Sequence, residues 1–191
     1  MLFRSARLIE SGFDMQPMVH LRRHVREHGI EGEVAWSVLR PMPGVMPEGR
    51  IQYVYPHTPD LAWPPGSTEH PNRADSLTGI LVCVADPEEG RVRYARFLNR
   101  EAGSNGFETD RGVVRIVGPE AAATMFDAFE APSLPFMAAA TIATLDLGAT
   151  RRVLSDNGVA VRVDGDGALW VSPADALGGH LCFHEPGKAP F

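Results

Sequence analysis

The sequence predicts an α+β fold assembled from a repeated strand–helix–strands unit. Short apolar runs rich in β-forming residues alternate with segments that carry helix caps and helical apolar spacing. Clusters of proline and glycine divide the chain into short elements. The unit occurs about three times within 191 residues, and internal repeats outweigh local assignments when a fold is predicted.

The first copy of the unit lacks its opening strand. Residues 6–12 have the form of a helix end that stops at a glycine, a common C-terminal stop. Three strands are expected to follow, near residues 17–25, 33–39 and 51–55. This copy therefore begins at its helix.

Three histidines spaced by four residues, His20, His24 and His28, mark the first of these strands. On a helix they would share one face, but the apolar residues among them alternate as in a strand. Arginines lie between them and would repel a bound cation. The pattern therefore predicts a solvated basic strand rather than a metal site.

A proline-rich segment, residues 56–71, follows the first copy and leaves little room for regular structure. A second proline-containing break at residues 131–135 separates the two later copies. We therefore expect an incomplete first module (residues 1–63), a linker (64–76), a second module of the βαββα type (77–130) and a third, βαβββ module (131–191).

The second copy opens with residues 77–85 (LTGILVCVA), an apolar run typical of a strand buried on both faces. Asp86 is expected to cap the following helix, with Pro87 at its first position and two glutamates in its first turn. The apolar stripe of this helix is predicted to contain Val92, Tyr94, Ala95, Phe97 and Leu98. Strands near 106–109 and 113–117 and a helix from 119 to about 129 complete the copy.

The third copy repeats this plan from residue 136 onwards. Residues 136–144 are predicted to form a strand, and Asp146 is expected to cap a helix that ends at Asn157-Gly158. Two further strands are joined by a turn at residues 164–167, and a final strand closes the copy: 159–163, 168–171 and 179–184.

The composition excludes several classes of function. A net charge of -6 without a long Lys or Arg block argues against a general nucleic-acid binder. Cys83 and Cys182 lie inside apolar runs and are predicted to be buried thiols of a reducing compartment. No apolar run approaches the roughly 20 residues of a membrane span, and no signal peptide is visible, so we expect a cytoplasmic protein. Residues 2–5 (LFRS) match the translation of a common sequencing-adapter tail, so we expect N-terminal sequence to be missing.

Two groups of segments resemble a known superfamily. Residues 165–173 (GDGALWVSP) and 176–183 (ALGGHLCF) resemble the closing half of a vicinal-oxygen-chelate (VOC), or glyoxalase-like, βαβββ module. Residues 57–63 (HTPDLAW) and 70–72 (HPN) are similar to a linker in longer, multi-module glyoxalase-like proteins. The resemblance covers nearly the whole chain. It implies paired modules that form a curved mixed or antiparallel sheet around a cup, as in bleomycin-resistance-like proteins.

In catalytic members of that superfamily, the resemblance implies a divalent metal that acts as a Lewis acid, held by His, Glu or Gln of the first and last strands. Strand alternation sends Leu181 and Phe183 towards the helices and His180, Cys182 and His184 towards the cup. By the motif, the usual Glu ligand falls at Cys182, and the two opening strands carry no His, Glu or Asp at their centres. We therefore predict no metal site from the residues themselves, and a divalent metal stays an implication of the resemblance.

His57 and His70 flank the linker and are our candidates for acid–base chemistry, because loops on rigid scaffolds often carry functional residues. The candidates for ligand contact lie beside them or on the last strand: Trp63, Asn72, His180, Cys182 and His184. The alternative interpretation is structural, since asparagine is an ordinary turn former and the strand residues could line a cup without chemistry.

The leading interpretation is a glyoxalase-like protein that binds a small organic ligand in the cup, as a relative of lyases, isomerases or dioxygenases. The alternative is a metal-free protein that binds or sequesters a small molecule without turnover. A third interpretation is that an incomplete module exposes a sheet edge and has no activity alone. The expected partner is a small molecule, with neither nucleic acid nor membrane, and a homodimer is compatible with module pairing.

Overall fold

The computed structural model describes residues 2–27, 29–104, 106–126 and 129–191. The chain divides into two compact units, Met1–Thr68 (unit 1) and Glu69–Phe191 (unit 2). Each unit has its own sheet.

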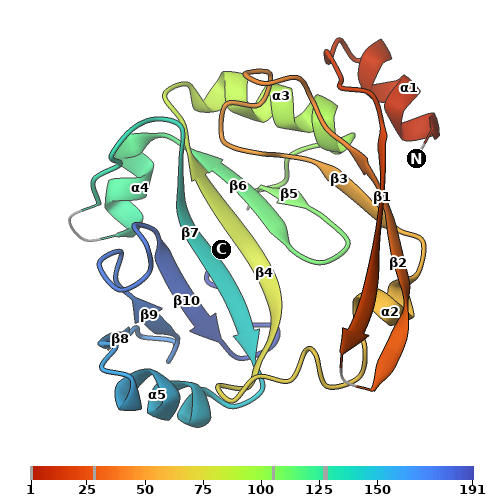
Figure 1. Cartoon of the computed structure of the whole chain (residues 1–191). Helices are drawn as coiled ribbons and strands as arrows, with labels where there is room; N and C mark the ends of the chain where they lie inside the picture. The colour runs from red at the N-terminus through yellow and green to blue at the C-terminus, as the bar shows by residue number, and fades with distance from the viewer. Residues whose placement is uncertain (1, 28, 105, 127–128) are drawn as a thin grey trace. The chain divides into compact units, whose positions relative to one another are not determined.

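Unit 1 contains a three-stranded antiparallel sheet in the order β1-β2-β3 (Figure 1). Its elements are α1 (Leu2–Glu10), β1 (Val19–Glu27), β2 (Ile30–Leu39), β3 (Tyr53–Pro56) and α2 (Pro59–Ala62). The three predicted strands are therefore present, and His20 and His24 lie on a strand rather than a helix. His28, the third histidine of that pattern, lies outside the described residues. The short helix α2 corrects the expectation that the proline-rich segment has no regular structure, because Pro59 stands at a helix start, where proline is tolerated.

Unit 2 contains a seven-stranded mixed sheet in the order β5-β6-β4-β7-β10-β9-β8. Its strands are β4 (Ala74–Cys83), β5 (Phe107–Glu108), β6 (Val113–Val117), β7 (Phe136–Thr144), β8 (Val161–Val163), β9 (Leu169–Val171) and β10 (His180–His184). Its helices are α3 (Pro87–Leu98), α4 (Pro119–Met125) and α5 (Leu147–Asp156). The strand β7 has the predicted bounds, and β4 begins three residues before the predicted Leu77.

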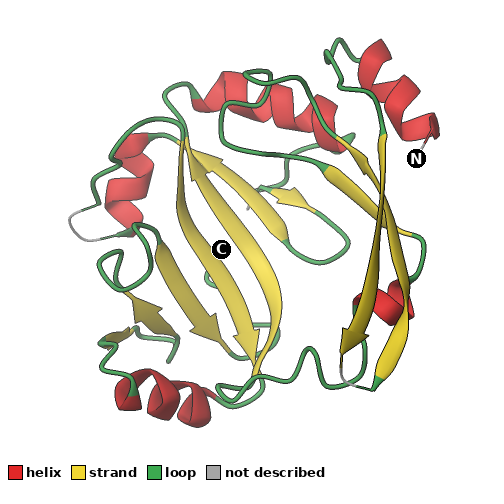
Figure 2. Ribbon diagram, viewed as in Figure 1, coloured by secondary structure: helices red, strands yellow, loops and turns green. Residues whose placement is uncertain are grey.

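The order of the strands follows from the repeat. In each half of the sheet the opening strand pairs in parallel with the last strand of its copy, β4 with β6 and β7 with β10. The two opening strands, β4 and β7, pair antiparallel and join the halves edge to edge (Figure 2). The predicted α+β class with mixed and antiparallel sheets is confirmed.

Helix α3 begins where the cap chemistry predicts. The Asp86 side chain accepts hydrogen bonds from the backbone N–H groups of Glu88 and Glu89. The predicted buried stripe was wrong at Val92, whose side chain is 60% exposed. Tyr94 and Phe97 of the predicted stripe are buried, and so is Gly90. The absence of a side chain at Gly90 lets the helix approach the sheet, because a Cβ there would lie 2.9 Å from Ile116 Cγ2.

The two faces of the sheet in unit 2 have different coverings. Helices α3 and α5 lie on one face, where Phe183 packs with Leu147 and Leu154 of α5. The other face carries the larger core cluster, in which Phe126, just after α4, and Phe191 pack on the sheet. In Figure 1 the C-terminus lies over β4 and β7, at the middle of the sheet. This second face, which carries Cys182, is called the cup face.

No helix among the described residues is both long and apolar enough to cross a membrane.

Candidate functional site

The last strand of unit 2, β10, presents three polar side chains to the cup face, as alternation predicts. Leu181 and Phe183 pack towards α5, while Cys182 belongs to the opposite cluster. On that face the register places Cys182 beside Thr141 of β7 and Trp170 of β9. The predicted orientation of this strand is therefore confirmed.

Cys182 and His184 are closed to solvent, with exposed fractions of 0% and 1%. The ring of Phe191 and the aromatic residues after α4 cover this part of the face. The polar atoms of His184 are used internally: Nδ1 donates to the Glu185 carbonyl (2.7 Å), and Nε2 lies 2.7 Å from Thr78 Oγ1. Thr78 Oγ1 in turn lies 2.9 Å from Thr141 Oγ1. The side chains of His184, Thr78 and Thr141 therefore form a chain of hydrogen bonds within the protein.

The residues at this position do not fit the divalent metal that the resemblance implies. Cys182 stands where the motif places a Glu ligand, and burial raises its thiol pKa to about 12, so it stays protonated and a poor ligand. Its neighbours in register are Thr141 and Trp170, which are not metal ligands of this type. Within the described part of the chain, no three His, Cys, Asp or Glu side chains converge. No chemical step is therefore assigned to a metal here.

His180, the first residue of β10, lies in an aromatic cluster at the edge of the cup. Its ring stacks on Phe126, with centroids 4.3 Å apart and planes inclined by 11°. Trp170 meets both rings edge-on, at 5.4 Å from Phe126 and 6.4 Å from His180. The three side chains come from the turn after α4, from β9 and from β10, so the fold rather than local sequence assembles them.

This cluster opens into a pocket of about 410 Å³. Its wall is completed by the end of β9 and the start of β8, with Val161, Arg162, Val171, Ser172 and Pro173. Burial lowers the pKa of His180, and the positive charge of Arg162 lowers it further. At neutral pH the pocket therefore combines aromatic faces, a neutral imidazole and one guanidinium group.

The β8–β9 hairpin fixes two of these groups. Arg162 and Trp170 are cross-strand partners, and the guanidinium carbon lies 6.0 Å from the Trp170 ring centroid. Asp164 at the turn accepts a 2.8 Å hydrogen bond from Trp170 Nε1 and further bonds from the backbone of Asp166 and Ala168. Burial alone would raise the pKa of Asp164, but these hydrogen bonds outweigh it and lower the pKa. The ionised carboxylate thus holds the indole ring in place.

His57, the first acid–base candidate, lies in unit 1 just after β3. Its Nε2 is 2.7 Å from Ser37 Oγ, and His20 Nδ1 is 2.9 Å from the same oxygen. The hydroxyl can accept from either imidazole and donate its one hydrogen to one of them. Ser37 is 1% exposed, so its oxygen is not open to a substrate, whereas the two histidine rings are exposed. The serine therefore orients the His57 ring, and a catalytic role for His57 stays a prediction.

The remaining candidates are not among the residues that line the pocket beside His180. Trp63 belongs to unit 1 and is 53% exposed, directly after α2. His70 is exposed in unit 2, where its carbonyl accepts from Arg73 N in a turn. Asn72 works as a turn former, with Oδ1 accepting from Ala74 N and its carbonyl accepting from Thr150 Oγ1. Of the seven candidates, His180 alone lines the pocket described above.

Arg162 and Phe126 line the pocket but were not among the ligand-contact candidates predicted from the sequence. The turn at residues 164–167 fixes the hairpin register, so the pairing of Arg162 with Trp170 could have been derived from it. Phe126 reaches the pocket by tertiary packing, and nothing in its own segment indicates that position.

No protein-family model matches the chain, and no curated protein matches it. Among solved structures, a hypothetical protein from Staphylococcus aureus matches with a TM-score of 0.58 at 8% identity, over 96% of this chain and 61% of that protein. The methylmalonyl-CoA epimerase from Mycobacterium tuberculosis matches with a TM-score of 0.46 at 18% identity, over 64% and 95%. A methylmalonyl-CoA epimerase in complex with methylmalonyl-CoA and NH4+ matches with a TM-score of 0.39 at 16% identity, over 60% and 98%. At such identities the likeness concerns the fold alone.

Proposed function

We propose that unit 2 binds a small, flat organic anion in the pocket beside His180, without a metal ion in that pocket. The observation that carries this proposal is the Phe126–His180–Trp170 cluster, which opens into about 410 Å³ next to Arg162. Pockets of roughly 300–1,000 Å³ with aromatic walls and a few polar groups are typical small-molecule sites.

The chemistry of the wall defines the ligand class. Aromatic side chains favour a flat unsaturated ring, which can lie against the face or edge of Trp170. Arg162 supplies a charged donor for a carboxylate, and guanidinium–carboxylate hydrogen bonds are stronger than neutral ones. His180, neutral at physiological pH, adds a hydrogen-bonding group that does not repel a cationic neighbour.

Binding without turnover accounts for this site better than catalysis. His184 has both ring nitrogens engaged within the protein, and Cys182 is a buried protonated thiol. The two polar side chains nearest the middle of the cup are thus unable to transfer protons to a ligand in the pocket. A glyoxalase-like lyase, isomerase or dioxygenase activity remains the alternative, with His57 and His70 as its acid–base candidates.

The test is a titration with 2-naphthoate and its neutral isostere 2-naphthamide, followed by the indole N–H signals of the three tryptophans in ¹H–¹⁵N spectra. We expect naphthoate to shift the Trp170 signal saturably and to bind more tightly than the amide. Arg162→Gln should weaken naphthoate binding about tenfold, the value of one charged hydrogen bond. Arg152→Gln on α5 is the matched control, because Arg152 is exposed and does not line the pocket.

Two results would overturn the proposal. If Trp170 does not respond to naphthoate, or if the Arg162 and Arg152 variants bind it equally, the pocket does not recognise a flat anion. Metal analysis of the purified protein tests the other half of the proposal. One tightly held ion per chain that is lost in a His180→Ala variant would replace metal-free binding with metal chemistry.

A further inference from the structure

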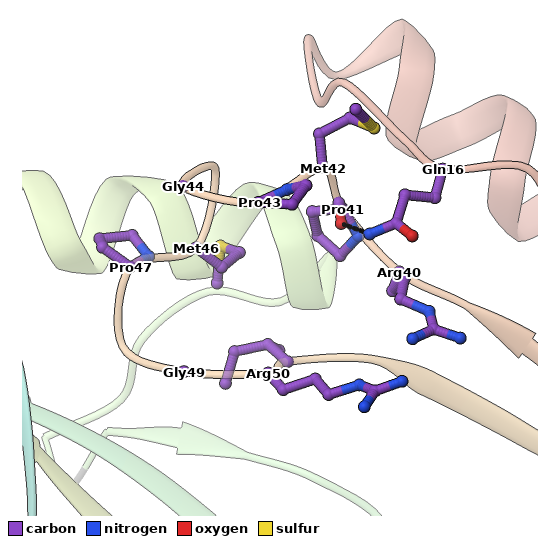
Figure 3. Close-up of a pocket in the computed structure, with 11 residues that line it drawn as sticks. Gln16, Arg40, Pro41, Met42, Pro43, Gly44, Met46, Pro47, Gly49 and Arg50 are labelled. Atoms are coloured by element: carbon purple, nitrogen blue, oxygen red, sulfur yellow. Dashed lines mark hydrogen bonds between the residues drawn. The ribbon is translucent and has the colours of Figure 1, made fainter.

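A second pocket lies in unit 1 and is independent of the one proposed above. It has a volume of about 680 Å³ and is lined by Gln16 and by the loop between β2 and β3 (Figure 3). Arg40 stands at the start of this loop and Arg50 near its end. In Figure 3 the two arginine side chains extend in the same direction from the two arms of the loop.

The charges of the two arginines are not offset by any described carboxylate. In residues 2–27, 29–104, 106–126 and 129–191, no carboxylate forms an ion pair with Arg40 or Arg50. The Nε atom of Arg40 is buried and has no hydrogen-bond acceptor within the part of the chain that the structure describes. Glu48, the acidic residue of the loop, is buried and does not line the pocket. A buried N–H group without an acceptor is unfavourable, so an acceptor supplied from outside would stabilise the site.

The rest of the wall is apolar and offers few donors of its own. Met42, Met46 and Ile51 contribute apolar side chains. The three prolines of the wall carry no backbone N–H, and Gln16 Nε2 already donates to the Pro41 carbonyl at 2.9 Å. The charge of the pocket therefore comes from the two guanidinium groups, and its shape comes from methionine and proline.

We propose that this pocket, the Arg40–Arg50 pocket, binds a second small organic anion with an apolar body. The anionic head, a carboxylate or a phosphate, lies between the two guanidinium groups, because both heads present paired oxygens that match the donor fork of arginine. The apolar body lies against the methionine and proline wall, and thioether side chains adapt readily to such a surface.

The experiment uses the full chain labelled with ¹³C at its methionine methyl groups. The chain has seven methionines, and each gives its own methyl signal. Hexanoate, hexyl phosphate and the neutral hexanamide are titrated in turn, at constant ionic strength. We expect both anions to shift the Met42 and Met46 methyl signals saturably and to bind at least tenfold more tightly than hexanamide. The tighter of the two anions identifies the head group, while Met125 and Met137 in unit 2 report any binding elsewhere.

Arg40→Gln and Arg50→Gln should each weaken binding of the preferred anion by fivefold or more. Arg26→Gln on β1 is the matched control, because Arg26 is 82% exposed and lies outside the pocket; its effect should stay within twofold. Arg40→Lys keeps the positive charge but lacks the paired donors of the guanidinium group. Its affinity for the preferred anion should lie between those of the native protein and Arg40→Gln, which distinguishes a loss of recognition from misfolding. Equal binding of hexanoate and hexanamide, or equal loss in the Arg40 and Arg26 variants, would overturn the proposal.

Discussion

The aromatic ring of Phe191 should contribute a large part of the stability of the cup. Phe191 is 7% exposed and belongs to the same core cluster as Leu81, Ala139 and Cys182. Phe191→Ala should lower the free energy of unfolding of unit 2 by about 3 kcal/mol, the lower end of the range for buried Phe→Ala. Phe191→Leu, which retains most of the apolar volume, should lower it by about 1 kcal/mol.

Hydrogen exchange of backbone amides is the suitable assay, because it measures unit 2 strand by strand. Amides of β4 and β7, which pair directly beneath the ring, should lose roughly a hundredfold in protection in Phe191→Ala. Lys188→Ala is the matched control, and it should leave protection unchanged because the Lys188 side chain forms an exposed ion pair with Glu185. A loss below about fivefold in Phe191→Ala, or an equal loss in both variants, would refute the packing argument.

Three further predictions concern single side chains. Cys83 and Cys182 should resist a thiol reagent such as DTNB in the native protein, because burial raises both thiol pKa values. On unfolding, both thiols should react, and DTNB should release two equivalents of thionitrobenzoate per chain. Rapid labelling of the folded chain would contradict this. The lowered pKa of His180 means that the unfolded chain takes up a proton more readily than the native one. The free energy of unfolding should therefore fall as pH drops below about 6.5, and denaturant titrations at several pH values should show a smaller fall in His180→Gln. Asp86→Ala removes the acceptor for two backbone N–H groups and should cost about 1 kcal/mol of unfolding free energy by denaturant titration, whereas Glu88→Ala should cost less.

The elements of unit 2 could be predicted because their determinants are local. Asp86 and Asp146 accept hydrogen bonds from backbone N–H groups two or three residues ahead, so each cap is visible in its own segment. Strand alternation likewise depends on neighbouring positions, and it assigned the two faces of β10 correctly. The error at Val92 has a tertiary cause: the predicted stripe was wider than the face that the sheet covers, and the close approach at Gly90 turns Tyr94 and Phe97 inward and leaves Val92 exposed.

The burial of Cys182 and His184 could not be predicted from their strand. Alternation showed which face they share, but their exposure depends on Phe126 and Phe191, which reach that face from other parts of the chain. The same holds for the Arg40–Arg50 pocket, since the two arginines are ten positions apart and meet one cavity because the loop between them folds back. Residues brought together by tertiary packing leave no periodic pattern in the sequence.

The middle of the cup is shaped for a side chain of the protein itself. Gly79 on β4 lies opposite Thr141 on β7, and a Cβ at Gly79 would lie 2.7 Å from Thr141 Oγ1 and 3.2 Å from the Phe191 ring. The absence of a side chain at residue 79 therefore makes room for the ring, which seals the hydrogen-bonded chain from Thr141 to His184 beneath it. Because that volume is already filled, space for a ligand on this face lies at the edge of the sheet, where Trp170 and His180 border the open pocket. The proposed site of unit 2 is thus a consequence of how the cup is packed.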